Sequence, residues 1–102
     1  MLFGERKYIL EFCNAAIESF SEYSIHYKLY LLERDETKLR KAGHKIKPVA
    51  QMLGLDNLLE EYENAKILLQ TECSDQFLED SVKRVDQIIE IVILDLKEII
   101  AT

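Results

Sequence analysis

The chain has 102 residues, of which 48% are hydrophobic and 31% charged, and its formal net charge is −6. These values are typical of one globular domain, taken here as residues 1–102, and exclude a disordered segment. Three glycines, one proline and two cysteines are too few for a β-sandwich or barrel, or for a disulfide scaffold. The longest stretch without a charged residue, 48–55, is far shorter than the roughly 20 residues that span a bilayer. No signal peptide is recognisable, so we expect a cytoplasmic protein.

The first half of the chain carries a long stripe of mostly apolar residues at helical spacing, from Leu10 to Leu31. Asn14 or Ser19 could cap a second helix, so both one long helix and a short extra N-terminal helix followed by a longer one stay open. A polar break at 34–37 follows, with Asp35 or Thr37 as the next cap. The stripe consists of Leu10, Cys13, Ile17, Phe20, Ser24, Tyr27 and Leu31, with Ser24 as its one interruption.

Three further amphipathic segments follow. One covers 38–53 and ends at Gly54, a residue typical of a helix C-terminus. The next begins at Asp56, expected as its cap, and runs to Leu69. The last extends from Leu78 to Ile99 after a polar break at 71–74, and its extra isoleucines indicate burial on more than one side. Connections of a few residues predict an all-α, antiparallel up-and-down four-helix bundle.

Charge is divided unevenly along the chain. Residues 1–47 hold 9 basic and 7 acidic residues, whereas 48–102 hold 4 and 12. Five cations fall within ten positions: Lys38, Arg40, Lys41, Lys45 and Lys47. Such a run is most often a solvated helix face, but on an acidic protein it also fits an anionic group or an acidic partner.

His44 is the candidate reactive residue of the segment 38–53. At about 100° per residue, it lies almost opposite the apolar stripe, among the cations and beside Gln51. That position argues against a hydrogen-bonded core histidine. A zinc site would need further ligands, and His26 is the only other histidine; a nucleophile helped by a base would need an acid nearby, where cations stand instead.

An exposed imidazole can act on phosphorus without such a partner. Near neutral pH an ordinary imidazole mostly carries a free lone pair, its pKa being about 6.5. An attached phosphoryl group adds roughly two negative charges, for which the cations are counter-ions. Lys47, one helical turn after His44, is the best placed. Pro48 indicates either that the helix ends at Lys47 or that it continues with a kink that leaves His44 accessible; the apolar period favours the second.

The run AGHKIKPVAQMLGL resembles the signature of histidine-containing phosphotransfer (HPt) domains: a His, a Lys three residues later, small residues in the next turn and a Leu-Gly pair. Here these are His44, Lys47, Ala50 and Leu53-Gly54. The motif covers about residues 39–66 and the architecture the whole chain. Two positions depart from the family pattern: Pro48 replaces a usual Gly, and Lys66 stands where many members have an acidic or amide residue.

The resemblance implies a phosphorelay intermediate without kinase activity of its own. It would accept a phosphoryl group on His44 from a receiver-domain aspartyl phosphate and pass it to the aspartate of a response regulator. From their places on the same side of the helix as His44, Lys47 would be the counter-ion and Gln51 would hydrogen-bond the imidazole or the phosphoryl group. The receiver would supply Mg²⁺, so no cofactor or metal is expected in this chain, which we expect to be a monomer. The expected docking residues are Arg40, Lys41, Lys45, Pro48 and Met52.

Two alternatives remain. A non-catalytic interaction module would bind an acidic partner through the basic face of 38–47. A polybasic membrane- or nucleic-acid-binding helix is less favoured, because the rest of the chain is acidic; we expect neither of these partners. His26 and Cys13 are interpreted as packing residues, and Cys73 falls in a polar connection where an exposed side chain is expected.

Overall fold

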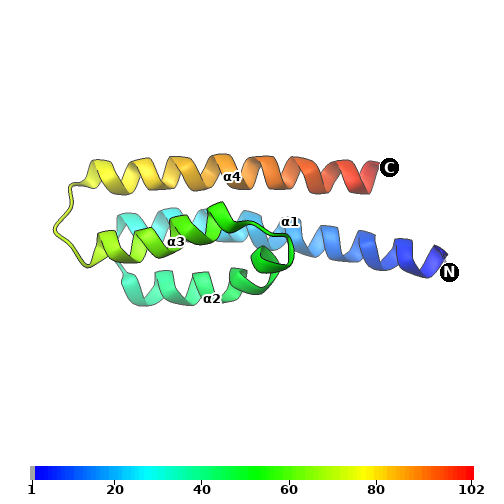
Figure 1. The fold of residues 1–102 in the computed structure, drawn as a ribbon, viewed down its shortest axis with the longest axis horizontal. Coiled ribbons are helices and arrows are strands. Elements are labelled where there is room, and N and C mark those ends of the chain that lie inside the picture. Colours follow the sequence, from blue (N-terminus) through cyan, green and yellow to red (C-terminus); the bar gives the residue numbers. More distant parts are fainter. Residues whose placement is uncertain (1) are drawn as a thin grey trace.

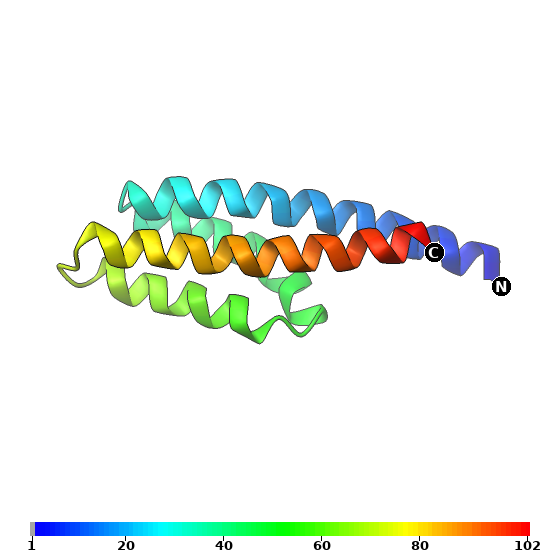
Figure 2. The ribbon, with the colours of Figure 1, turned by 90° about the horizontal axis from the view of Figure 1, so that it is seen from above.

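The computed structural model describes residues 2–102, with side chains from Gly4 onward. It contains four helices and, within 2–102, no strand: α1 (Leu2–Leu32), α2 (Glu36–Met52), α3 (Asp56–Leu69) and α4 (Asp75–Ala101). Consecutive helices run antiparallel (Figures 1 and 2), and α1 and α3 each pack against both α2 and α4. The predicted four-helix bundle is confirmed.

The α1 helix is one continuous element, so residues 2–32 do not contain the short extra N-terminal helix that the sequence left open. Neither Asn14 nor Ser19 caps a helix, since both lie within α1. The predicted stripe was wrong at Ser24: Tyr23 takes that core position, and the Ser24 hydroxyl lies at the edge, donating to an Asp86 carboxylate oxygen at 2.7 Å. The physical reason is that side chains one position apart can both border a wide helix interface, and the larger apolar one gains more from burial.

The helix ends follow local hydrogen-bonding rules. The α1 C-terminus closes with Asp35 N–H donating to the Tyr30 carbonyl and Arg34 N–H to the Leu31 carbonyl, with Arg34 in the left-handed region at φ 57°. Gly54, at φ 68°, ends α2 in the same way, as predicted. Asp35 caps α2 by accepting from the Lys38 amide.

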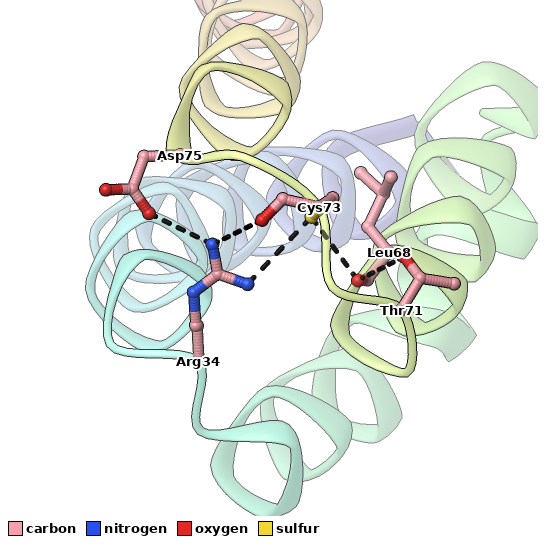
Figure 3. Close-up of polar contacts among 5 residues, drawn as sticks. All are labelled: Arg34, Leu68, Thr71, Cys73 and Asp75. Atoms are coloured by element: carbon pink, nitrogen blue, oxygen red, sulfur yellow. Dashed lines mark hydrogen bonds and ion pairs between the residues drawn. The ribbon is translucent and has the colours of Figure 1, made fainter.

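Two predictions about residues in the connections were wrong, one for Asp56 and one for Cys73. Asp56 does not cap α3. It is the first helical residue after the cap Leu55, where its carboxylate interacts favourably with the positive end of the helix dipole. Cys73 is partly buried rather than exposed, because its thiol donates to the Leu68 carbonyl. The Arg34 guanidinium approaches the Cys73 sulfur at 3.9 Å and donates to the Cys73 carbonyl and to the Asp75 carboxylate (Figure 3), which joins the α1–α2 turn to the α3–α4 turn.

Burial is concentrated on one face of each helix, and one polar chain crosses the core. The hydroxyl of Tyr27 lies 2.6 Å from that of Ser81, which donates to Glu61 on α3; Arg84 donates to the same carboxylate. Cys13 is buried as expected. None of the described helices has the length and apolar character needed to cross a membrane.

The helices have unequal lengths. α1 and α4 contain 31 and 27 residues, whereas α2 and α3 contain 17 and 14. Figures 1 and 2 show α1 and α4 extending together past the turn between α2 and α3. The molecule, 54 Å along its longest axis, therefore has four helices at one end and two at the other.

Candidate functional site

His44 lies near the middle of α2 with its side chain exposed to solvent. The opposite side of the helix is buried through Leu39, Ala42, Ile46 and Ala50. α2 continues through Pro48 to Met52, so the helix does not end at Lys47. Lys47 and Gln51, at i+3 and i+7 from His44, are exposed as well, and these three side chains share one outward side of α2.

The backbone behind His44 is held by a close approach between α2 and α3. The Tyr62 ring packs directly on Gly43, where a Cβ atom would lie 2.1 Å from the ring. The Tyr62 hydroxyl also donates to the Arg40 carbonyl at 3.3 Å. Because Arg40 lies one turn before His44, this contact supports the helical turn that carries the histidine.

Two charged residues of α3, Lys66 and Glu63, lie near the cations of α2. Lys66 donates to the Glu63 carboxylate at 2.7 Å and lies over the Tyr62 ring, 4.7 Å from its centroid. The bond from Lys66 is the main reason that the pKa of Glu63 is lowered, and Lys47 and Arg40 contribute through their charge. The Glu63 carboxylate therefore interacts with Lys66 of its own helix and with two cations of α2.

On the side toward α1, Lys45 forms a 2.7 Å ion pair with Glu22. This pair lowers the pKa of Glu22 and raises that of Lys45. His26 approaches the same carboxylate at 3.8 Å and stacks on Tyr30, as expected for a packing residue. Lys41, Pro48 and Met52 are exposed.

The basic run is therefore partly neutralised by the protein itself. Arg40, half-buried rather than fully exposed, pairs with Glu36 at 2.8 Å, and Lys38 approaches Asp35 at 3.9 Å. Within the described part of the chain, Lys41 and Lys47 form no ion pair, and the His44 side chain takes part in no hydrogen bond or ion pair. Among the described residues on the His44 side of α2, the cations without an ion pair are Lys41, one turn before the histidine, and Lys47, one turn after it.

Sequence reasoning missed Gly43, Tyr62 and Glu22. The glycine next to the histidine was a usable signal, because a helix-interior glycine often marks a close helix contact; the partners of Gly43 and Lys45 come from other helices and left no local pattern. Among the described residues, no group of three or more His, Cys, Asp or Glu side chains is arranged to hold a metal ion.

Comparison with protein-family models, with curated proteins and with solved structures yields no match for this chain.

Proposed function

We propose that this protein is a phosphocarrier in which His44 accepts a phosphoryl group from a receiver-domain aspartyl phosphate and transfers it to another receiver. One observation carries the proposal: the imidazole lies exposed in the middle of a rigid helix, with Lys47 and Gln51 on the same side. A docking protein can reach such a ring, whereas a histidine inside a pocket would be accessible mainly to small molecules.

The reaction requires only an acceptor nitrogen and a counter-ion from this chain. An unprotonated ring nitrogen of His44 attacks phosphorus, an N–P bond forms, and the acyl phosphate P–O bond breaks to leave the receiver's aspartate as a carboxylate. Reversal onto a second aspartate completes the relay. Catalysis of phosphoryl transfer consists mainly of positioning and charge stabilisation. The receiver would supply Mg²⁺, and Lys47 would offset the charge of the phosphoryl group after transfer.

The fold supports this role through rigidity around the reacting group. Gly43 is clamped under Tyr62, and Tyr62 is fixed in turn by its bond to Arg40 and by Lys66 above its ring. A backbone held on one side leaves only side-chain rotation for His44, which lowers the entropy lost when a partner docks. Pro48 and Met52 add exposed apolar surface beside the ring, which suits a modest, reversible interface with Arg40, Lys41 and Lys45 at its edge.

The alternative of an acidic partner bound by the basic face of 38–47 has weaker support. Three of the five cations already pair with Asp35, Glu36 and Glu22. Such a partner would have to compete with these carboxylates, so the electrostatic gain is reduced.

The test is incubation of the protein with a receiver domain phosphorylated on aspartate, in the presence of Mg²⁺. We expect label to appear on this chain in an adduct that is labile to acid and stable to base. His44→Gln should abolish labelling, while His26→Gln, which removes the only other histidine, should leave it intact. Absence of label on the native chain with several receivers, or equal labelling of His44→Gln, would refute the proposal.

A further inference from the structure

At the two-helix end of the bundle, apolar side chains that continue the core positions become exposed to solvent. On α1, Tyr23 and Ala16 are each 3% exposed. Ile9, one heptad before Ala16 and therefore on the same side of the helix, is 48% exposed. On α4 the exposed fraction also rises at heptad spacing, from 1% at Val85 and 8% at Val92 to 45% at Ile99. The exposure rises where α2 and α3 have ended, because no helix covers these positions there.

The side of α1 that faces α2 is also apolar beyond the end of α2. Ser19 and Glu22 line the small cavity between α1 and α2, so residues one and two heptads before them lie on the same side. These include Phe12, which is partly buried, and Tyr8, which is 71% exposed. We call Tyr8, Ile9, Phe12 and Ile99 the open face.

The rim of the open face is acidic. Glu5 lies one heptad before Phe12. Asp95 and Glu98 lie two heptads after Ser81 and Arg84, which contact Glu61 of α3, and therefore share the side of α4 that faces α3. All three carboxylates are exposed. Among residues 4–19 and 88–102, the positions at heptad spacing from Glu5, Asp95 and Glu98 hold no Lys or Arg; Arg6 is exposed at a neighbouring position of α1, one heptad before the buried Cys13. Lys97 lies elsewhere, in the groove on the back of the helix pair with Ile25 and Leu94.

We infer that the open face is a docking site for an amphipathic helix of a partner protein whose apolar stripe is flanked by Lys and Arg. Apolar contacts in a groove between two helices and opposite charges at the rim are the elements of helix-in-groove recognition. From Val92 to the end of α4 the face extends about 15 Å, enough for roughly three turns of a bound helix. A second copy fits less well, because its rim would carry the same negative charges.

The open face lies apart from His44. Lys45, next to His44, forms an ion pair with Glu22 of α1, so His44 lies in the four-helix part of the bundle. The open face lies on the parts of α1 and α4 that extend beyond the α2–α3 turn (Figure 1). A partner on the open face would therefore leave His44 accessible, and the inference does not rest on the proposed function.

The probe for the test is a labelled synthetic helix with leucines at heptad positions and lysines elsewhere, together with its counterpart in which glutamate replaces lysine. We expect fluorescence anisotropy to show binding of the lysine peptide, weakened by added salt, and little binding of the glutamate peptide. The double variant Tyr8→Gln/Ile99→Gln should bind at least tenfold more weakly. The matched variant Ile25→Gln/Leu94→Gln, which alters exposed apolar residues on the back of the pair, should bind like the native chain.

Circular dichroism checks that each variant is folded. If the open-face variant unfolds, Asp95→Asn/Glu98→Gln tests the rim alone and should weaken binding of the lysine peptide. The inference is overturned if the open-face and back variants bind alike, if both peptides bind equally, or if rim neutralisation has no effect. Sedimentation of the chain alone as a dimer that Tyr8→Gln/Ile99→Gln dissociates would assign the face to a second copy and would also overturn it.

Discussion

The ring of Tyr62 occupies the space where Gly43 would carry a side chain, with the nearest ring atom 2.1 Å from the Cβ position. The contact joins α3 to α2 immediately beside His44. It makes the glycine a requirement of the helix packing rather than of backbone conformation, because Gly43 lies within the regular helix α2.

Gly43→Ala should lower the free energy of unfolding by about 1–3 kcal/mol, as is usual when an added methyl group overpacks a core. Urea denaturation measures this change. The control is Gly4→Ala, also in a helix but with nothing within 4 Å of the added Cβ; it should stabilise by about 0.5–1 kcal/mol, since alanine favours helices. Stabilisation by Gly43→Ala would show that Tyr62 moves aside freely.

Two neighbouring tyrosines should respond oppositely to loss of the hydroxyl group. The Tyr23 hydroxyl is buried and has no hydrogen-bond partner among the described residues, whereas that of Tyr27 bonds to Ser81; burial raises the pKa of both phenols. Tyr23→Phe should stabilise by about 1 kcal/mol, and Tyr27→Phe should destabilise by about 1 kcal/mol or more. Equal losses in thermal unfolding experiments would contradict the assignment.

Acid should destabilise the fold through its paired carboxylates. Lys45 lowers the pKa of Glu22 and Lys66 that of Glu63, each below the ordinary 4.5. A carboxylate with a lowered folded-state pKa contributes stability above the unfolded value, and this contribution is lost as pH falls through the folded value. The free energy of unfolding should therefore decrease below about pH 4.5.

The variant Lys45→Met/Lys66→Met should show a shallower loss of stability with acid, because both carboxylates then titrate nearer their ordinary pKa. Lys97→Met, which removes a lysine without an ion pair in the described part of the chain, is the control and should keep the native slope. Identical slopes for all three proteins would mean that these pairs do not set the acid response.

Pro48 has no N–H to donate to the His44 carbonyl, although α2 is helical on both sides of it. Pro48→Ala should restore that hydrogen bond and stabilise the protein by about 1–3 kcal/mol. Because Pro48 is exposed, the smaller side chain should leave no cavity. A loss of stability on chemical denaturation would show that the proline conformation is required at this point.

If His44 carries the phosphoryl group, Lys47→Met should slow its phosphorylation by a receiver roughly tenfold, since an exposed counter-ion to a phosphoryl group is lost. Lys83→Met removes an exposed lysine of α4 and should leave the rate unchanged. Equal rates in a time course of labelling would separate Lys47 from the reaction while leaving His44 as the acceptor.

Much of the fold could be predicted because helix signals are local. Apolar spacing identified all four helices, Gly54 marked the end of α2, and Asp35 was one of two proposed caps. The same periodicity placed His44 and Lys47 on the outward side of α2. Sequence reasoning failed at Ser24, where the neighbouring Tyr23 is the buried residue, at Asp56, which is the first residue of α3 and not its cap, and at Cys73, whose thiol donates to the Leu68 carbonyl.

The amino-acid sequence alone therefore determined the helices and the side of each that faces solvent, because these depend on residues within about two turns of one another. Only the tertiary structure decided that Tyr62 meets Gly43, that Glu22 binds Lys45, and that α1 and α4 extend past their neighbours to expose Ile9 and Ile99. Those relationships depend on the register between helices distant in the chain, which is set by how their side chains pack and not by the pattern of any one helix.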